Sequence, residues 1–274
     1  MSSEHPMIAV RREISREELL EKYPSASSPR LAITTAVLEP VPELIQKCIG
    51  SWWKTATLNL AANETLIRTN KPDDNLGVTG SLQWLYEHTT APIIAFLHSD
   101  CEIFEQGWDE RVLREFDDPE VGLVGFGGGR QHGHEDIYKT PYRLEQLARS
   151  GYISNTSDAE SHGARLVGSA NVAVLDGFAL VMRRSLLDRV GGWPVKELPF
   201  HCYDYWTAIT AHRHGYSVRC VGIKCQHWGG ATATTPAYQE WSLKVLGKSD
   251  AQIHEDSHRV IYEMGRGVLP WRCE

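Results

Sequence analysis

Long apolar runs are absent from this 274-residue sequence. No stretch approaches the ~20 apolar residues of a membrane-spanning helix, and the polar start, MSSEHPMIAVRREISREELL, has no apolar core of a secretory signal. Positive charge is also scarce, because 28 Lys and Arg face 35 Asp and Glu and give a formal net charge of −7. This balance disfavours a protein whose affinity comes from nucleic-acid phosphates. We therefore expect a cytoplasmic protein without a membrane span.

Cysteine is scarce as well, and its six residues are scattered without a C-x-x-C pair. This spacing excludes a disulfide scaffold and predicts reduced thiols. A zinc site of Cys220, Cys225 and His227 is disfavoured, because its spacing differs from that of zinc ribbons and zinc fingers.

Several catalytic signatures are missing. The segment GFGGGR has Arg130 where the dinucleotide fingerprint G-x-G-x-x-G requires its third glycine. The sequence also lacks the G-K-[ST] of P-loop enzymes and the G-x-S-x-G of α/β-hydrolases. These absences disfavour a classical NAD-binding protein, a P-loop nucleotidase and a standard hydrolase.

What the sequence does contain is an alternation of short apolar runs with helical periodicity, beginning at Arg30. Apolar residues make up 42% of the chain, which suits a globular protein. The β-α-β order indicates an α/β fold with a parallel sheet flanked by helices. In such sheets ligands bind at the carboxyl ends of the strands. The strands are predicted over 31–37, 66–69, 93–97 and 121–126, with helices between them.

The second half of the chain is less regular. Residues 127–170 are rich in Gly, His and Ser and predict long loops with one short helix near 142–149. Residues 171–184 predict a long strand, or two strands interrupted at Asp176-Gly177. The other predicted elements are a short helix capped by Ser185, a helix over 203–214, a strand over 216–223 and two helical patterns within 236–264.

The strand over 93–97 runs directly into the segment HSDCE. Asp100 and Glu102 are two residues apart, so in an extended chain both side chains project to the same side. Two oxygen ligands suit a hard divalent cation such as Mg²⁺ or Mn²⁺, which can hold a diphosphate. The alternative is that Asp100 only caps the helix that follows.

His227 follows the last predicted strand, in KCQHWGG. Its imidazole could complete the coordination of a metal held by Asp100. The alternative is a structural histidine that is hydrogen-bonded within the fold. Two tryptophans, Trp193 and Trp228, lie in glycine-rich turns, where a ring can serve as a platform for a sugar or can pack in the core.

The segment FHCYD precedes the helix over 203–214. Asp204 lies in its first turn, where the helix dipole favours a carboxylate. We interpret Asp204 as a general base, aided by His201, that deprotonates an acceptor hydroxyl. Simple capping is compatible with this role, because a capped carboxylate stays ionised.

In one consistent order over residues 30–230, these segments resemble the GT-A glycosyltransferases, in particular the family-two-like group. HSDCE is similar to the H-x-D version of the D-x-D motif in a bacterial and viral subgroup. The other matching segments are ITTAVLEP, similar to the opening nucleotide-binding strand; NLGVTG, similar to the N-x-G segment; and DGFALVMRR, GGWP, FHCYD, HGY and HWGG, similar to the acceptor-side half.

The resemblance implies a single Rossmann-like GT-A domain with a mostly parallel central sheet. It divides the chain into an N-terminal arm (1–29), the GT-A domain (30–230) and a C-terminal helical extension (231–274). Within the domain, residues 30–126 would bind the nucleotide and residues 127–230 the acceptor.

The resemblance also implies roles for single residues. Asp100 and His227 would bind the metal, and either Glu102 or His98 could join them. Asp204 would be the general base, and Asp176 would contact the sugar or the acceptor. The sequence departs from the family at His98, which replaces the first Asp of D-x-D, and at Tyr203, which replaces a Glu. The donor nucleotide would contact Thr35, Ala36, Asn70, Asn75, Ser99 and Asp100.

The implied function is metal-dependent transfer of a hexosyl or pentosyl group, with Mn²⁺ or Mg²⁺, from a UDP- or GDP-linked donor to a saccharide or another hydroxyl acceptor. Inversion with Asp204 as base is expected, and retention stays open, as do the donor sugar and the oligomeric state. The alternatives are a nucleotidyltransferase, a non-catalytic sugar-nucleotide-binding module and a viral-type enzyme that glycosylates a modified base in DNA. The last would need a local basic face, for which the candidates are Arg130, Arg143, Arg165, Arg183 and Arg184.

Overall fold

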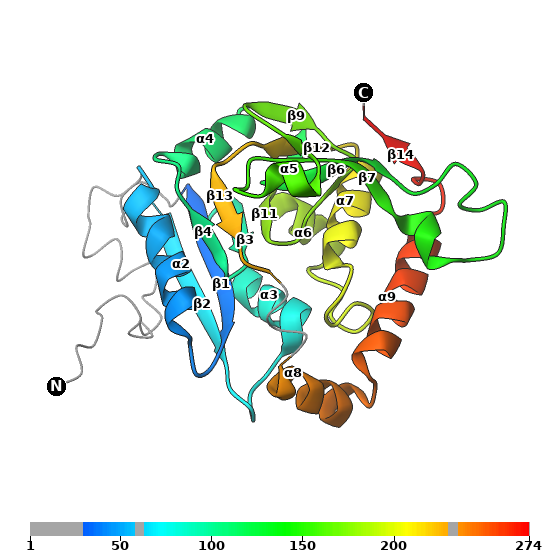
Figure 1. Ribbon diagram of the computed structural model, residues 1–274, viewed down its shortest axis with the longest axis horizontal. Helices are drawn as coiled ribbons and strands as arrows, with labels where there is room; N and C mark the ends of the chain where they lie inside the picture. The colour runs from blue at the N-terminus through cyan, green and yellow to red at the C-terminus, as the bar shows by residue number, and fades with distance from the viewer. Residues whose placement is uncertain (1–29, 58–62, 230–234, 274) are drawn as a thin grey trace.

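The computed structural model describes residues 30–57, 63–229 and 235–273. They form an α/β fold in which a seven-stranded sheet lies between helices (Figure 1). The predicted fold class is therefore confirmed, whereas the predicted arm over 1–29 lies outside the described residues. The strands of the large sheet are β1 (Leu31–Leu38), β2 (Asn63–Asn70), β3 (Ile93–Leu97), β5 (Val121–Gly125), β9 (Ser169–Asn171), β11 (Ala179–Arg183) and β12 (Ser217–Val221).

The large sheet is mixed, with the strand order β2-β1-β3-β11-β5-β12-β9 and with three parallel and three antiparallel pairings. β1 is parallel to β2 and β3, and β12 is parallel to β5. β11 is antiparallel to both of its neighbours, and β9 is antiparallel to β12. β2, β1, β3, β5 and β12 therefore run in one direction, and their carboxyl ends lie at the edge where α/β sheets bind ligands.

Helices cover both faces of this sheet, because the inner strand β3 is apolar on both sides. Ile94 and Phe96 lie in one hydrophobic core, whereas Ile93, Ala95 and Leu97 lie in the other. The first core contains residues of α3 (Gly77–Glu87), α6 (Arg184–Val190) and α7 (Tyr203–Arg213), and the second contains residues of α2 (Glu43–Thr55) and α4 (Trp108–Glu115).

The region over 127–170, predicted as long loops, instead holds most of a second sheet. Its first strand is glycine-rich because neighbouring strands pass too close for a side chain: a Cβ on Gly128 would lie 2.5 Å from the carbonyl oxygen of Val174. A strand without apolar alternation gives no periodic signal, which is why loops were wrongly predicted here, whereas the short helix predicted near 142–149 is present as a 3₁₀ helix. The elements are β6 (Gly127–His132), the 3₁₀ helix η1 (Leu144–Leu147), β7 (Arg149–Ser154), α5 (Ala159–His162) and β8 (Ala164–Arg165), and the sheet is completed by β10 (Val174–Leu175) and β14 (Trp271–Arg272).

Within the apolar stretch over 171–184 lie two strands, β10 and β11, separated at Asp176-Gly177, which is the second of the two predicted alternatives. The helix that follows, α6, begins at Arg184 with Arg183 as its N-cap, so the predicted cap at Ser185 is wrong. β11 runs against its neighbours because the chain returns to the large sheet from the second sheet rather than through a helix.

A third, two-stranded sheet connects the two halves of the chain. It pairs β4 (Cys101–Ile103), which follows β3, with β13 (Cys225–His227) in antiparallel register. His227 lies opposite Cys101, and the Trp228 N–H donates to the carbonyl of Asp100 at 3.2 Å. This pairing brings residues that are far apart in the sequence to the carboxyl end of β3.

The C-terminal helices pack onto the domain. α9 lies beside α7, on the side of the molecule away from α2 (Figure 1). Ile261, Tyr262 and Leu269 belong to the same hydrophobic core as Ile94 and Phe96 of β3. None of the helices in the described part of the chain is long and apolar enough to cross a membrane. The elements of this region are α8 (Pro236–Trp241), the π-helix η2 (Ser242–Leu246) and α9 (Asp250–Met264).

Candidate active site

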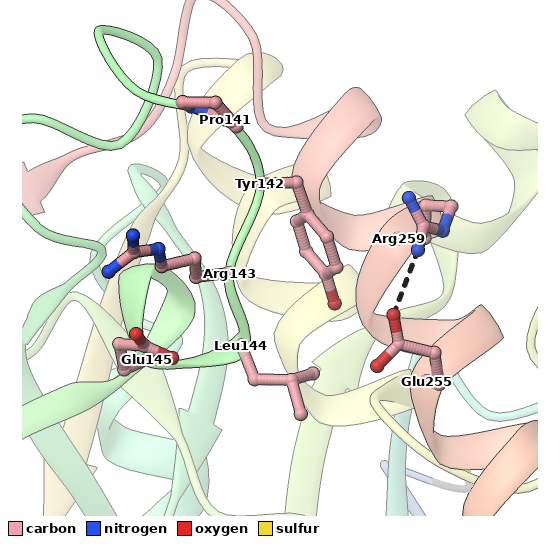
Figure 2. Close-up of a pocket in the computed structure, with 7 residues that line it drawn as sticks. All are labelled: Pro141, Tyr142, Arg143, Leu144, Glu145, Glu255 and Arg259. Atoms are coloured by element: carbon pink, nitrogen blue, oxygen red, sulfur yellow. Dashed lines mark hydrogen bonds and ion pairs between the residues drawn. The ribbon is translucent and has the colours of Figure 1, made fainter.

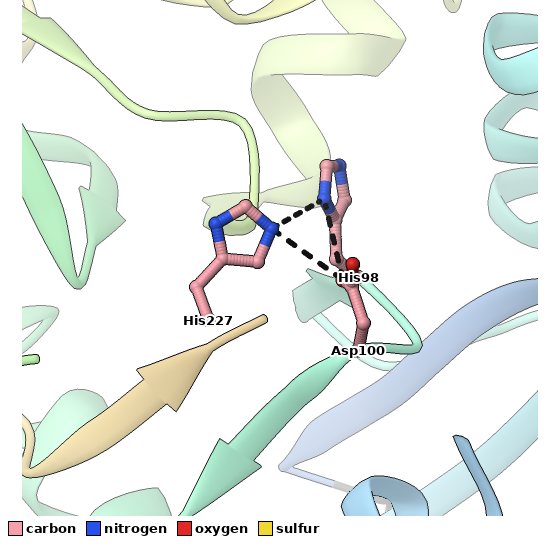
Figure 3. Close-up of side chains that lie close together, drawn as sticks. All are labelled: His98, Asp100 and His227. Atoms are coloured by element: carbon pink, nitrogen blue, oxygen red, sulfur yellow. Dashed lines mark hydrogen bonds and ion pairs between the residues drawn. The ribbon is translucent and has the colours of Figure 1, made fainter. Parts of the chain in front are cut away.

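Three side chains meet at the carboxyl end of β3 and form what we call the metal group: His98, Asp100 and His227 (Figure 3). Nδ1 of His98 lies 3.4 Å from Nε2 of His227 and 3.9 Å from Oδ1 of Asp100. The same oxygen lies 3.4 Å from Nε2 of His227. Among the described residues, these three are the cluster that could hold a metal ion, and it includes neither Cys220 nor Cys225.

The three ligand atoms of the metal group, Nδ1 of His98, Oδ1 of Asp100 and Nε2 of His227, are spaced to hold a cation. The circle through them has a radius of about 2.1 Å, so a cation at its centre would lie within the about 2.0–2.2 Å range of nitrogen and oxygen ligands around Zn²⁺ and Mg²⁺. Three protein ligands leave further coordination positions open, as in catalytic metal sites. The group can therefore hold a metal and still admit ligand oxygens.

The charge of the metal group also suits a cation. Burial would raise the pKa of Asp100, but its hydrogen bond with His227 and the charges of both imidazoles outweigh burial and lower this pKa. Burial and repulsion from His227 lower the pKa of His98. At neutral pH the group therefore offers a carboxylate and a neutral imidazole, the forms that bind metals.

The structure does not bring the predicted ligand Glu102 to the metal group. Its carboxylate lies 2.9 Å from Nζ of Lys47, and the Glu102 side chain is 7% exposed. Asp100 lies in the turn before β4 and Glu102 lies inside β4. The alternation rule that predicted a shared side therefore does not apply, and His98 supplies the third ligand atom instead.

A second polar cluster, which we call the Asp204 group, consists of Asp204, Asp176, Arg149 and Tyr152. Asp204 lies in the first turn of α7 and accepts a hydrogen bond from the Tyr205 N–H at 2.9 Å. Asp176, between β10 and β11, accepts from Nη2 of Arg149 at 2.9 Å and from the Tyr152 hydroxyl at 3.2 Å. The Arg149 guanidinium interacts with both carboxylates.

The environment of Asp204 favours proton transfer. Burial raises the pKa of Asp204 to about 6; the Arg149 charge opposes this rise, and the Asp176 charge adds to it. A carboxyl group with a pKa just below neutral is mostly ionised at pH 7 and can still accept a proton. The arrangement can therefore serve a general base.

His201, predicted to assist Asp204, contacts other partners. Its Nε2 lies 2.7 Å from Oδ1 of Asp250, which also accepts from the Tyr238 hydroxyl at 2.6 Å. Its ring centroid lies 5.0 Å from that of His254. These contacts connect His201 to the C-terminal helices rather than to Asp204, because the segment just before α7 packs against them: the Phe200 ring centroid lies 4.2 Å from that of Tyr238 in α8, and Cys202 contacts His258 in α9.

Two predicted donor-binding residues shape the turn between β2 and α3. Asn70 accepts from the Leu76 N–H at 3.2 Å and donates to the Ser81 hydroxyl at 2.9 Å. Asn75 accepts from the Gly77 N–H at 2.9 Å. These side chains are engaged within the fold, and a contact with a nucleotide stays a prediction.

The other predicted donor-binding residues lie at the same edge of the sheet as the metal group. Thr35 and Ala36 lie near the carboxyl end of β1, which is parallel to β3. Ser99 lies in the turn between His98 and Asp100. They therefore share an edge of the sheet with the metal group, although Thr35 is only 1% exposed, and a contact with a nucleotide stays a prediction.

The two tryptophans in glycine-rich turns, Trp193 and Trp228, differ in their exposure. Trp193 is buried and packs against Phe96 with ring centroids 5.2 Å apart, so it is a core residue and not a sugar platform. Trp228 is 50% exposed and directly follows His227. The Nζ of Lys47 lies 5.9 Å from its ring centroid. The residue that directly follows the metal-group histidine His227 therefore keeps an accessible ring.

Two of the five arginines considered for a basic face are structural. Nη2 of Arg183 donates to the carbonyl of Phe116 at 2.8 Å, and Nη2 of Arg184 donates to the carbonyl of Thr89 at 2.5 Å. These contacts tie β11 and α6 to neighbouring loops.

Arg149 and Tyr152 are the site residues that sequence reasoning missed. Both lie in β7, inside the region predicted as loops. The signal of a half-buried strand is apolar alternation, which RSGYIS does not show. Because their only link to Asp176 is spatial, no spacing along the chain could have identified them.

A separate hollow of about 440 Å³ lies between the segment before η1 and α9 (Figure 2). The guanidinium of Arg259 lies 4.8 Å from the ring centroid of Tyr142 and bonds Glu255 at 2.9 Å. The hollow therefore has an aromatic and charged wall, distinct from the metal group. Its lining residues are Pro141, Tyr142, Arg143, Leu144, Glu145, Glu255 and Arg259.

Comparisons with known proteins agree with the sequence resemblance. Residues 58–191, almost half of the chain, match the family model of glycosyl transferase family 2. A comparison with curated proteins gives no match. The family match and the fold confirm the resemblance to GT-A glycosyltransferases, whereas the H-x-D subgroup is not confirmed.

Two solved structures show how far the similarity extends. One is a mannosyltransferase, PcManGT from Pyrobaculum calidifontis, in complex with GDP-Man and Mn²⁺; it has 14% identity and a TM-score of 0.47, over 89% of this chain and 71% of that one. The other is GalNAc-T7 with UDP, GalNAc and Mn²⁺, with 9% identity and a TM-score of 0.52, over 78% of this chain and 48% of that one. This chain thus spans about half the length of GalNAc-T7, and at such identity the likeness concerns the fold.

Proposed function

We propose that this chain, as a family-two-like GT-A glycosyltransferase, transfers a sugar from a nucleotide-diphosphate donor to an acceptor hydroxyl. The transfer would use a bound divalent cation. The observation that supports this most is the metal group, whose three ligand atoms lie at the carboxyl end of β3 with cation spacing. The Asp204 group adds a carboxyl group suited to accept a proton.

Each cluster has a distinct task in this proposal. The bound cation would offset the charge of the diphosphate leaving group. Asp204 accepts the proton of the attacking hydroxyl, which makes the oxygen a better nucleophile. Arg149 holds Asp176 at 2.9 Å, which keeps this carboxylate in place to orient the sugar or the acceptor. Direct attack with Asp204 as base leads to inversion at the anomeric carbon.

The ligand set favours Mn²⁺ over Mg²⁺. Two imidazoles and one carboxylate suit a transition metal, whereas Mg²⁺ prefers oxygen ligands. The structural neighbour GalNAc-T7 was solved with Mn²⁺ and UDP, which is consistent with this choice. UDP and GDP donors, and hexosyl and pentosyl groups, are equally compatible with the described residues. We place the reaction in the cytoplasm, where nucleotide sugars are soluble substrates.

The experiment that tests this function is calorimetric titration of the purified chain with UDP, GDP and their sugars, with Mn²⁺ or with EDTA. We expect one nucleotide class to bind, and to bind more tightly with Mn²⁺. Donor hydrolysis or transfer, followed by chromatography of the released nucleotide, then distinguishes an enzyme from a binding module.

Two results would contradict the proposal. Full activity in EDTA would exclude the metal, and the absence of binding to any nucleotide diphosphate would exclude the donor class. A gel shift with modified DNA, repeated at high salt, tests the DNA-directed alternative separately.

A further inference from the structure

The two ring nitrogens of His98 face different partners. Its Nδ1 faces the metal group, 3.4 Å from Nε2 of His227 and 3.9 Å from Asp100. Its Nε2 lies 2.5 Å from the hydroxyl of Tyr203. The ring can bind a metal through Nδ1 only when the proton of the neutral imidazole is on Nε2.

The Tyr203 hydroxyl can select between the two tautomers. Besides Nε2 of His98, it lies 3.5 Å from the carbonyl oxygen of Gly177. A carbonyl oxygen only accepts, so a Tyr203 hydroxyl that donates to Gly177 can accept the N–H of His98. The lone pair of Nδ1 then faces the metal group. The opposite tautomer would place an N–H where the cation must bind.

Two features of the backbone position the Tyr203 hydroxyl for its contact with His98. Tyr203 is buried, with 8% exposure, and a Cβ on Gly177 would lie 2.7 Å from its hydroxyl oxygen. Cys202, which precedes it, is the only non-glycine among the described residues with a positive φ, at 61°. Such backbone strain is common at functional positions. A glycine on one side and a left-handed residue on the other therefore set the position of the phenol.

We propose that Tyr203 is a positioning residue that holds His98 in the Nε2-protonated tautomer and so directs Nδ1 at the cation, an inference that rests on the proposed function. Outer ligands of this kind orient the imidazoles of metal sites. The second imidazole is held differently, because the His227 ring stacks on Phe178 with centroids 4.7 Å apart and planes 16° apart. Since Tyr203 precedes Asp204 in α7, one helix start orients a metal ligand and carries the base.

The first test is nuclear magnetic resonance of the ¹⁵N-labelled full chain without metal, in EDTA. A long-range ¹H–¹⁵N spectrum reports the tautomer of His98, whose signals are assigned by their loss in His98→Gln. We expect Nε2–H in the wild type and a mixture of tautomers in Tyr203→Phe. An Nδ1–H tautomer in the wild type would overturn the proposal without any variant of Tyr203.

The second test is the affinity for Mn²⁺ alone, measured by electron paramagnetic resonance. We expect Tyr203→Phe to bind Mn²⁺ about 10- to 100-fold more weakly, the usual effect of removing such an outer ligand. Gly177→Ala should act in the same direction, since its methyl group displaces the phenol. Tyr138→Phe is the matched control, because its hydroxyl donates to the Tyr262 carbonyl at 2.9 Å, outside both clusters.

The outcomes test the role of Tyr203 and the proposed metal site separately. Unchanged Mn²⁺ affinity and an unchanged tautomer in Tyr203→Phe would overturn the role of Tyr203. If the wild-type chain binds no Mn²⁺, the proposed metal site fails, while the metal-free spectra still decide whether Tyr203 sets the tautomer.

Discussion

Two aspartates in this molecule carry opposite pKa shifts. Asp100, in the metal group, has a lowered pKa because His227 and His98 outweigh the effect of its burial. Asp204, in the Asp204 group, has a pKa raised to about 6 because burial outweighs the nearby Arg149. One carboxylate is thus kept charged, as cation binding requires, and the other is poised to exchange a proton.

These opposite pKa shifts show that the charged groups around an aspartate, and not the residue type, decide whether it binds a cation or exchanges a proton. Asp100 has two imidazoles within 4 Å, whereas the positive partner of Asp204 also bonds Asp176 at 2.9 Å and is shared between two carboxylates. Pairs of carboxyl groups whose pKa values are driven apart mark separate charge-binding and acid–base tasks.

The largest effect is expected from removing a ligand of the metal group. Asp100→Ala or His227→Ala should abolish Mn²⁺ binding and transfer, because two remaining ligands cannot hold a divalent cation firmly. Calorimetry with Mn²⁺ and a transfer assay measure this. Asp136→Ala is the control, since that carboxylate is half-exposed and pairs with Lys139, outside the metal group. Divalent-dependent activity in Asp100→Ala would contradict the assignment.

A large but different effect is expected at Asp204. Asp204→Asn should lower kcat about 10²- to 10⁴-fold, the usual contribution of a general base, while donor binding stays within about twofold. The amide keeps the size of the side chain but cannot accept the proton. Loss of donor binding in calorimetry would show that Asp204 binds the nucleotide sugar instead.

A smaller effect is expected from pH. Since Asp204 must be ionised and its pKa is about 6, kcat/KM should fall as the pH falls through 6 and be about tenfold lower at pH 5 than on the plateau. Asp176→Asn should move this acid limb to lower pH, because it removes a charge that raises the pKa of Asp204. An acid limb that persists in Asp204→Asn belongs to another group.

The smallest effect is expected at Glu102. Glu102→Gln should change Mn²⁺ affinity less than about threefold, because its carboxylate pairs with Lys47 at 2.9 Å and not with the metal group. This variant sharpens the contrast with Asp100, two residues away. A loss comparable to that of Asp100→Ala would show that Glu102 reaches the cation.

The parallel part of the fold was predictable because its strands and helices are periodic. β1, β3 and β5 were each predicted within a residue of their ends, since burial on both faces requires continuous apolar runs. The second sheet was not predictable. β6 is glycine-rich and β7 is polar, because close backbone approach and side-chain polarity at the site replace hydrophobic burial there.

The candidate site was predictable in part. The sequence predicts Asp100, His227 and Asp204, because they follow strands or begin a helix at the ligand-binding edge. Glu102 and His201 satisfy the same rules but pair with Lys47 and Asp250. The position of a residue after a strand predicts that it lies at the ligand-binding edge of the sheet. It does not predict which charged side chain, distant in the sequence, pairs with that residue.

The sequence by itself determined the α/β class, the edge at which ligands bind and the resemblance to GT-A glycosyltransferases, because these depend on local periodicity and motif order. Only the tertiary structure decided that His98 completes the metal group and that Tyr203 contacts it. Both depend on the pairing of β4 with β13 and on the start of α7, contacts between segments more than a hundred residues apart. Such contacts leave no periodic trace in a single chain, since the energy that fixes them comes from packing between elements.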